Sequence, residues 1–560
     1  KIKRMFSDKE LVQDLISIFV QQGLRYMVVS PGSRNAPVSF TAHAHPEIQL
    51  YSIPDERVAG YFALGMSQQI NEPVALICTS GSAGFNYGPA VAEAFFQKTP
   101  LIVLTADRPE EWVAQGEGQT IFQKDLFGKH VLFSAQLNEN LNDSDLRWFN
   151  QRTINEAWEV CTQQNQGPVH LNLAFREPLY GKTDQIKKAP IKKTLQMEHR
   201  MTSNQWDSLA GRINSLEKVM VIVTQNGGLS KNTDLNNFAS HGNVLVLTET
   251  TSNTYGKEMI SCIDRLLESL DPEKSQELLP ELVITIGHNI ISKKLKNLLR
   301  SGSMQHWHVD ETDRFIDTFQ QLEYSLPVNG DQFLTEILKR KESSTSTYHS
   351  KWLLHELEIK KRHGAFLEEL DFCDLKSFSA IMPAIPAESH VQMGNSSVVR
   401  YIQLFDSRPD LHYFGNRGTS GIDGCTSTAI GAAVASKQET TLITGDIAFF
   451  YDSNAFWHNS VPKHLKIVLI NNGGGGIFRI INGPSASNAL EECFETPHKR
   501  SAEHIAKDHG LNYEKATNYK DLKDGMTWLY NQDNTAILEV FTPRIENDVQ
   551  LKKYFNNLKA

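Results

Sequence analysis

Short apolar runs alternate with amphipathic, helix-like stretches along most of this 560-residue chain. The runs include YMVVS, PVALICTS and PLIVLTADRP in the first third of the chain and TTLITGD and KIVLINN in the last. Short apolar runs between helical stretches are typical of strands that are buried on both faces of a parallel sheet. The alternation therefore predicts repeated βα units and an α/β fold class.

The alternation falls into three blocks that two polar stretches separate. One stretch is rich in lysine (YGKTDQIKKAPIKKTLQ, 180–196), and the other is charged and rich in Ser and Thr (LKRKESSTSTYHSK, 338–351). Blocks of about 150–200 residues are an ordinary size for one doubly wound sheet. We predict three doubly wound parallel-sheet domains, at residues 1–182, 198–342 and 350–560.

Charge and cysteine usage exclude several classes of partner. With 56 Lys and Arg against 65 Asp and Glu, the net charge of −9 gives no electrostatic footprint for nucleic acid or an anionic membrane. No apolar run approaches the roughly 18 residues of a membrane span. The six cysteines show no CxxC spacing, which argues against a zinc site and favours a reducing compartment. These features predict a cytoplasmic protein.

Polar residues gather where the predicted strands end. Ligands of open parallel sheets bind beyond the carboxyl ends of the strands, so these clusters predict one or more sites built from the first and third blocks. The clusters lie at residues 30–34, 79–84, 105–108, 394–397, 445–446 and 471–476.

Four consecutive glycines follow the apolar run KIVLI and two asparagines, at residues 473–476. Each glycine costs roughly 0.5–1 kcal/mol of backbone entropy relative to alanine within a regular element. A flexible linker is one interpretation, but linkers usually have polar flanks, and this run lies between an apolar strand and an Ile-Phe pair. The run therefore favours a ligand-facing loop that needs close backbone approach.

Asp446 and Asn472 end two consecutive predicted strands and are expected to lie side by side. Mg²⁺ takes oxygen ligands octahedrally and usually keeps one or two protein carboxylates, with water and substrate phosphate in the other positions. Asp446, the Asn472 amide oxygen and a glycine carbonyl, assigned to Gly474, would supply three ligands. The alternative is that Asp446 caps the following helix and Asn472 forms an Asx turn.

The pair Gly445-Asp446, followed after 24 residues by Asn471-Asn472, resembles the fingerprint of thiamine-diphosphate enzymes. In such a site the glycines would let backbone carbonyl and amide groups reach the metal and the diphosphate. Two departures are present. Ile447 replaces a common glycine, and NNGGGG lacks a common third asparagine, which leaves the carbonyl ligand open between Gly474 and its neighbours.

Thiamine chemistry needs a carboxylic acid beside the aminopyrimidine ring of the cofactor. The segment SIPDERVAGYFALG offers Glu56 at the start of a predicted helix, where desolvation would raise its pKa. The alternative is an acidic residue that complements the helix dipole. The resemblance to the glutamate-containing first domain of the family assigns the acid to Glu56.

The segments SPGSRNAPVSF, DERVAGYFALGMSQ, GNRGTSGIDGCTSTAIGAA and NNGGGGIF together resemble the family of 2-succinyl-5-enolpyruvyl-6-hydroxy-3-cyclohexene-1-carboxylate synthases of menaquinone biosynthesis. This resemblance implies decarboxylation of 2-oxoglutarate on thiamine diphosphate, with Mg²⁺ or Mn²⁺, and addition of the resulting succinyl-semialdehyde carbanion to isochorismate. It also implies a homodimer or homotetramer with active sites at the subunit interface. The middle block matches mainly in size and at GHNIISKKL.

The resemblance assigns residues to the cofactor and to the substrates. The cofactor positions are Glu56, Asn395, Ser396, Gly421, Ile422, Gly445, Asp446, Ile447, Asn472, Gly474, Ile477 and Phe478. The substrate positions are Ser33, Arg34, Arg108, Gln119, Lys293, Arg400, Arg417, Phe478 and Ile481. Both substrates are dicarboxylates, which guanidinium groups bind bidentately. For any single arginine the alternative is a solvated surface charge.

Other functions fit the sequence less well. An acetohydroxyacid synthase or a 2-keto-acid decarboxylase would share the thiamine fingerprint without needing an arginine cluster for two dicarboxylates. A non-catalytic relative would be expected to lose Glu56, Asp446 or Asn472. A nucleotide-binding loop at NNGGGG would lack the Lys-Ser/Thr pair of the P-loop.

Overall fold

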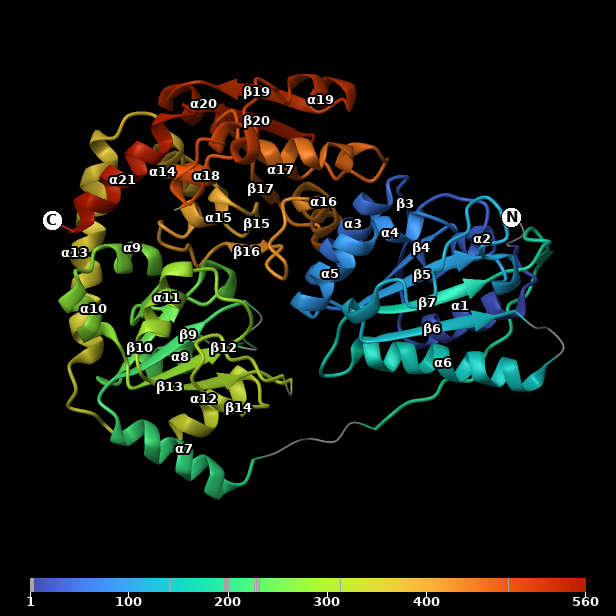
Figure 1. Ribbon diagram of the computed structural model, residues 1–560, viewed down its shortest axis with the longest axis horizontal. Coiled ribbons are helices and arrows are strands. Elements are labelled where there is room, and N and C mark those ends of the chain that lie inside the picture. The colour runs from blue at the N-terminus through green and yellow to red at the C-terminus, as the bar shows by residue number, and fades with distance from the viewer. Residues whose placement is uncertain are drawn as a thin grey trace.

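Three six-stranded sheets form the framework of the computed structural model (Figure 1). The structure describes residues 5–139, 143–195, 201–225, 227, 229, 232–312, 314–481 and 483–559. Every strand pairing within the three sheets is parallel, and helices lie on both faces of each sheet. The predicted α/β class with three doubly wound parallel sheets is confirmed. The predicted domain limits 1–182, 198–342 and 350–560 stay predictions.

The first sheet has the strand order β3-β2-β4-β5-β7-β6. Its strands are β2 (Tyr26–Val29), β3 (Gln49–Ser52), β4 (Val74–Cys78), β5 (Leu101–Asp107), β6 (Phe133–Asn138) and β7 (Val169–Ala174). Its helices are α1 (Glu10–Gln22), α2 (Ala36–Ala44), α3 (Glu56–Ile70), α4 (Ala83–Asn86), α5 (Gly88–Gln97) and α6 (Ser144–Thr162). A short antiparallel pair, β1 (Phe6–Ser7) with β8 (Lys182–Thr183), joins the two ends of this domain.

The third sheet has the order β16-β15-β17-β18-β20-β19. If the strands of each sheet are numbered from one along the chain, the first and third sheets have the same strand order. The strands are β15 (His390–Met393), β16 (His412–Gly415), β17 (Thr440–Gly445), β18 (Leu465–Asn471), β19 (Asn512–Ala516) and β20 (Ala536–Phe541). The helices are α14 (Asp374–Ala384), α15 (Ser397–Ile402), α16 (Cys425–Ser436), α17 (Asp446–Tyr451), α18 (Ile477–Ile480), α19 (Glu503–Asp508), α20 (Tyr519–Tyr530) and α21 (Glu546–Lys559).

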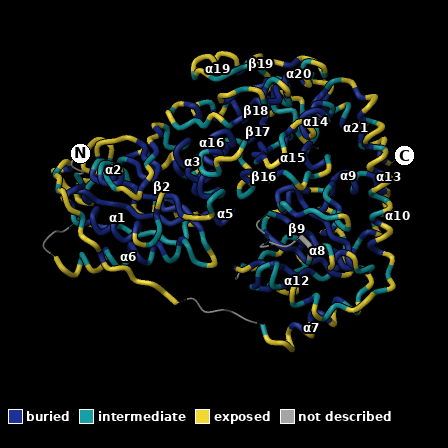
Figure 2. The backbone as a smooth tube through the Cα atoms, turned by 180° about the vertical axis from the view of Figure 1, so that it is seen from behind, coloured by how far each residue is buried: buried dark blue, intermediate teal, exposed yellow. Residues whose placement is uncertain are grey.

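The middle sheet is wound differently, in the order β11-β10-β9-β12-β13-β14. Its strands are β9 (Val219–Val223), β10 (Val244–Thr248), β11 (Met259–Ile260), β12 (Leu282–Ile286), β13 (Gln305–Val309) and β14 (Leu322–Leu326). The helices are α7 (Ser203–Ser215), α8 (Asn232–Ala239), α9 (Ile263–Glu268), α10 (Pro272–Leu278), α11 (Lys293–Ser301), α12 (Gly330–Leu338) and α13 (Tyr348–Glu369), which leads to the third domain. Figure 2 shows the mostly exposed stretch that runs from the first domain towards α7.

Helices α3 and α16 bring the first and third domains into backbone contact. A Cβ at Gly65 would lie 2.0 Å from the carbonyl oxygen of Thr428, and one at Gly431 would lie 1.9 Å from that of Phe62. Only glycine permits such an approach. The two helices share one buried apolar cluster that includes residues of both domains.

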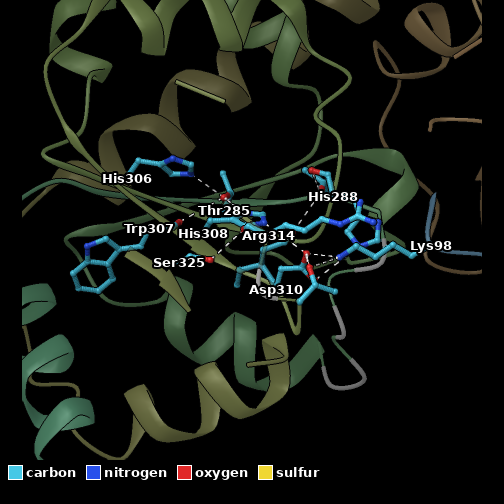
Figure 3. A network of polar contacts seen from close by, with 12 residues as sticks. Lys98, Thr285, His288, His306, Trp307, His308, Asp310, Arg314 and Ser325 are labelled. Carbon is cyan, nitrogen blue, oxygen red and sulfur yellow. Dashed lines mark hydrogen bonds and ion pairs between the residues drawn. The ribbon is translucent and has the colours of Figure 1, made fainter. Parts of the chain in front are cut away.

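A buried ion pair attaches the first domain to the middle sheet (Figure 3). Lys98, directly after α5, contacts Asp310, which follows β13, and also donates to the Thr312 hydroxyl at 3.0 Å. Both charged side chains are 7% exposed. His308 Nε2 lies 3.8 Å from the Asp310 carboxylate and continues the network into the sheet.

We expect Lys98→Met to lower the free energy of unfolding by about 3–5 kcal/mol, because it leaves the Asp310 carboxylate buried without its cation. Urea unfolding followed by circular dichroism measures the change. Lys339→Met removes a cation from a surface pair with Glu336 and is the matched control, with an expected change below about 1 kcal/mol. Equal small changes in both variants would contradict a structural role for the Lys98 pair.

Candidate active site

Asp446 and Asn472 lie side by side at one edge of the third sheet. Strands β17 and β18 pair with Gly445 opposite Ile470, and Asp446 and Asn472 follow directly after these strands. Both side chains are buried. This adjacency is the one expected from the sequence, while the role of the two residues as metal ligands stays a prediction.

The Asp446 carboxylate ties the end of β17 to the glycine run. Its Oδ2 accepts hydrogen bonds from the backbone N–H groups of Gly473 at 2.8 Å and Gly474 at 3.1 Å, and its Oδ1 accepts one from Ile447 at 2.7 Å. His498 Nε2 lies 3.3 Å from the same Oδ2. Two of the glycine amides expected to face a diphosphate therefore bond to Asp446 in this structure.

The Asn472 side chain is held by a residue far away in the sequence. Its Nδ2 donates to Asp374 Oδ2 at 2.9 Å, and Asp374 Oδ1 accepts from the Thr542 hydroxyl at 2.5 Å. Burial raises the pKa of Asp374 to about 6. The Asn472 Oδ1 is buried and has no hydrogen-bond partner. A buried oxygen without a donor, beside a carboxylate, fits a hard divalent cation.

The glycine run is packed tightly against the segment that returns over it. Gly473 has a φ of +76°, which favours glycine, and a Cβ at Gly474 would lie 3.0 Å from the carbonyl oxygen of Glu495. A Cβ at Gly475 would lie 3.1 Å from the Phe478 ring. The Gly474 carbonyl, one proposed metal ligand, accepts the amide two residues on at 3.0 Å. The run is thus a close-packed turn, not a flexible linker.

A cavity of about 640 Å³ lies between α11 of the middle domain and α15, α18 and α21 of the third. Four predicted site residues line it: Lys293, Arg400, Ile477 and Ile481. The Arg400 Nε is buried and has no hydrogen-bond partner. The lining combines apolar side chains and cations with the carboxylates of Asp264, Glu268 and Asp548, so a small organic anion would have to bind at the cations.

Arg417 lies on the loop after β16 and is held by Asn395. The Asn395 side chain accepts from Arg417 Nη1 at 2.6 Å and donates to the carbonyl oxygens of Asn416 at 2.8 Å and Gly421 at 2.6 Å. The neighbouring Ser396 has φ +69° and ψ −123°, a strained conformation for a residue other than glycine. Such strain is concentrated at functional sites.

Glu56 is the first residue of α3, and burial raises the pKa of its carboxyl group. Burial raises the pKa values of Cys78 and Tyr87 in the same domain, and the negative charge of Glu56 contributes to both rises. The preceding Asp55 is the N-cap, since its side chain accepts from the backbone N–H of Val58 at 3.2 Å. Capping of α3 is thus performed by Asp55, which leaves the Glu56 carboxyl available for another role.

Arg34 and Arg108 lie near each other at the carboxyl ends of β2 and β5. Burial raises the pKa of the neighbouring Asp107, and the positive charges of Arg34 and Arg108 both act to lower it. Arg34 Nη1 donates to the Phe175 carbonyl at 3.2 Å, and Arg108 Nη2 donates to the Gly118 carbonyl at 3.0 Å. Both are thus anchored in the first domain, and neither is a freely solvated surface charge.

The remaining predicted positions are less constrained. Ser33 and Gln119 are exposed, and Gln119 has a φ of +56°. Ile422 is half-buried on the loop before α16, and the Phe478 ring packs on Phe494. Among the described residues, no hydrogen bond or ion pair joins Glu56, Ser33, Arg34, Arg108 or Gln119 to the predicted site residues of the third domain. The predicted site therefore forms two separate groups within one chain.

Sequence reasoning missed Asp374 and His498, which contact Asn472 and Asp446, two of the three predicted metal ligands. Asp374 begins α14, and 98 residues separate it from Asn472. No local pattern marks either residue, because their relation to the site is created only by the folding of distant segments.

Two family models match the chain. The thiamine pyrophosphate enzyme N-terminal TPP binding domain matches residues 9–127, and the corresponding C-terminal TPP binding domain matches residues 392–540. Thiamine pyrophosphate is another name for thiamine diphosphate.

The chain is also similar to curated relatives over nearly its full length. It is 42% identical to the 2-succinyl-5-enolpyruvyl-6-hydroxy-3-cyclohexene-1-carboxylate synthase of Flavobacterium johnsoniae, covering 98% of this chain and 99% of the relative. It is 35% identical to the synthase of the same name from Bacteroides fragilis, covering 99% and 100%. Among solved structures, benzoylformate decarboxylase from Polynucleobacter necessarius matches with a TM-score of 0.72 at 15% identity, covering 95% and 98%. The last likeness concerns the fold alone.

We expect Asp446→Ala to weaken the binding of thiamine diphosphate by roughly ten- to a hundredfold at limiting Mg²⁺, because the diphosphate loses its charge-assisted link through the cation. Titration calorimetry at several Mg²⁺ concentrations measures the affinity. Asp524→Ala, at an exposed position of α20, is the control. If the variant kept a wild-type affinity with the same Mg²⁺ dependence, Asp446 would not be a metal ligand.

Proposed function

This chain belongs to the family of 2-succinyl-5-enolpyruvyl-6-hydroxy-3-cyclohexene-1-carboxylate synthases, and we propose that it decarboxylates 2-oxoglutarate and joins the remaining four-carbon unit to isochorismate. The products are CO₂ and the compound in the family name, an intermediate of menaquinone biosynthesis. Identity of 42% over 98% of the chain is the observation that carries the proposal. The enzyme is a thiamine-diphosphate-dependent transferase.

Thiamine diphosphate, when bound, would supply a cationic thiazolium ring that serves as the sink for the electron pair released by decarboxylation. We assign its diphosphate and a Mg²⁺ or Mn²⁺ ion to Asp446, Asn472 and the Gly474 carbonyl. The unpartnered Asn472 Oδ1 supports this assignment. Glu56 holds a proton at the aminopyrimidine ring nitrogen, since burial favours the protonated form of its carboxyl group.

The cations of the cavity bind the carboxylates of 2-oxoglutarate. Arg400 presents a buried, unpartnered Nε there, and Lys293 lines the same cavity. The Nε of Arg417 is also buried without a partner, and burial lowers the pKa of Arg417, with a further lowering from the nearby charge of Arg400. Arg34 and Arg108, with Ser33 and Gln119, are assigned to isochorismate.

The enzyme is proposed to work as a homodimer or a homotetramer, with each active site built from two subunits. The separation of the predicted residues into two groups within one chain supports this. Large apolar side chains are exposed in the first domain, including Phe85 of α4, Trp112 and Phe122. Burial of such side chains against a second copy would be favourable.

The protein is proposed to be cytoplasmic, because all six cysteines, each within the described residues, are unpaired. A survey of the described helices finds none whose length and apolarity would allow it to cross a membrane. The other thiamine enzymes considered from the sequence, acetohydroxyacid synthases and 2-keto-acid decarboxylases, are not favoured by the names of the similar full-length relatives.

The direct test is incubation of the protein with 2-oxoglutarate, isochorismate, thiamine diphosphate and Mg²⁺. We expect CO₂ release that depends on both substrates and equals the loss of isochorismate. Pyruvate in place of 2-oxoglutarate is the control and should support little turnover, because it lacks the distal carboxylate. Turnover of pyruvate at the rate of 2-oxoglutarate would contradict the proposed substrate.

We expect Glu56→Gln to bind thiamine diphosphate almost normally and to slow hydrogen–deuterium exchange at C2 of the bound thiazolium by about 10²–10⁴-fold, the range lost with a general acid-base group. Quenched-flow NMR measures the exchange. Glu47→Gln, on an exposed side chain of the same domain, is the matched control. Normal exchange in Glu56→Gln would remove this residue from the site.

We expect each arginine variant to lose about ten- to a hundredfold in kcat/KM, the cost of one charge-assisted contact. Arg400→Ala and Arg417→Ala should affect 2-oxoglutarate, whereas Arg34→Ala and Arg108→Ala should affect isochorismate. Steady-state kinetics with one substrate varied at a time measures both values. Arg152→Ala, at a half-exposed position of α6, is the control. Wild-type kinetics in all four variants would leave the dicarboxylate specificity without a physical basis.

A further inference from the structure

Glu93 is a fully buried carboxylate of the first domain whose partners lie on a loop of the third. It lies on α5 and is 0% exposed. It accepts hydrogen bonds from the backbone N–H of Gly418, the backbone N–H of Thr419 and the Thr419 hydroxyl, each at 2.6 Å. Buried carboxylates are costly unless they are fully hydrogen-bonded, so these three contacts fix the loop firmly against α5.

The backbones of α5 and the loop also touch. A Cβ at Gly418 would lie 2.6 Å from the Glu93 carbonyl oxygen and 3.1 Å from the Gln97 backbone nitrogen. One turn further along α5, Gln97 Nε2 donates to the Gly415 carbonyl at 2.9 Å. The start of the loop therefore follows the surface of α5 residue by residue.

The loop carries Arg417, and residues of all three domains hold the stretch from Arg417 to Thr419. Asn289 of the middle domain donates to the carbonyl oxygens of Arg417 at 2.8 Å and Gly418 at 3.2 Å. Asn395 of the third domain accepts from the Arg417 guanidinium at 2.6 Å. Glu93 supplies a carboxylate to these contacts. Burial lowers the pKa of Arg417, and the charges of Glu249 and then Glu93 oppose that shift.

We propose that Glu93 is a positioning residue for substrate binding, which fixes the 416–421 loop so that the Arg417 guanidinium faces a carboxylate of the keto acid. The inference rests on the proposed function, in which Arg417 binds 2-oxoglutarate. Glu93 itself touches neither substrate nor cofactor. It acts through the position of Arg417, where a displacement of about 1 Å is enough to cost up to a hundredfold in rate.

The test is a double-mutant cycle with Glu93→Ala and Arg417→Ala. We expect Glu93→Ala to lower kcat/KM for 2-oxoglutarate by about ten- to a hundredfold, mainly through KM. The double variant should lose no more than Arg417→Ala alone, because Glu93 acts through Arg417. Losses that add would overturn the inference, since they would show that the two residues act independently.

Two milder variants keep the test valid if Glu93→Ala does not fold. Glu93→Gln retains the shape of the side chain and one acceptor oxygen. Its NH₂ group replaces the other oxygen and cannot accept a hydrogen bond from the loop, so we expect an intermediate rise in KM. Gly418→Ala pushes the loop away from α5 without any change in charge and should raise KM in the same way. Unchanged KM values in both variants would overturn the inference.

Asp14→Asn is the matched control for a purely structural effect. Asp14 is also a buried carboxylate, with Arg147 Nε and Gln151 Nε2 both at 2.9 Å, but it lies on α1. We expect it to lower stability in urea with KM unchanged. Glu93 variants that lost stability with KM unchanged, like this control, would reduce Glu93 to a structural residue.

Binding of glutarate, a dicarboxylate without the keto group, is measured by calorimetry in the same proteins. Wild-type protein that does not turn over 2-oxoglutarate with isochorismate would refute the proposed function, and glutarate binding would still report on Glu93. We expect about tenfold or weaker glutarate binding in Glu93→Ala and Arg417→Ala alike. Wild-type binding in Glu93→Ala, or no glutarate binding in the wild type, would overturn the inference.

Discussion

The backbone contact between α3 and α16 determines how the two halves of the candidate site are related within the chain. Gly65 and Gly431 allow the helices to approach until a Cβ on either would overlap a carbonyl oxygen of the other. Helix α3 begins with Glu56, and α16 follows the loop that carries Arg417. A shift between these helices would therefore move the proposed acid of one group relative to the proposed substrate residues of the other.

Buried carboxylates fix the loops that carry the candidate residues. Asp446 accepts amides of the glycine run, Glu93 accepts amides of the Arg417 loop, and Glu249 accepts the amides of Ile291 and Ser292 just before Lys293. Burial raises the pKa of Glu249 to about 7. Each of these carboxylates lies near the carboxyl end of a strand or on a helix packed there, where backbone N–H groups of loops need partners.

The strand orders explain which sheets supply the two groups. The first and third sheets have the same strand order. In each, the second and third strands lie on opposite sides of the first strand, and ligands of such sheets bind in the crevice at the carboxyl end of that first strand. The clusters at residues 30–34 and 394–397 follow these first strands. The middle sheet has a different order. Its domain contributes residues of α9 and α11, among them Lys293, to the cavity beside the third domain, and Asn289 contacts the Arg417 loop.

The sequence by itself determined the α/β class, the three sheets, the family and the adjacency of Asp446 and Asn472. These follow from local apolar periodicity, from motifs, and from the rule that parallel strands end at one edge. Only the tertiary structure decided that Asp374 holds Asn472, that Glu93 holds the Arg417 loop and that Gly65 lies against Thr428. It also turned the glycine amides towards Asp446. Such contacts join distant segments, with 325 residues between Glu93 and Gly418, and a single sequence carries no signal for them because they depend on how whole domains pack.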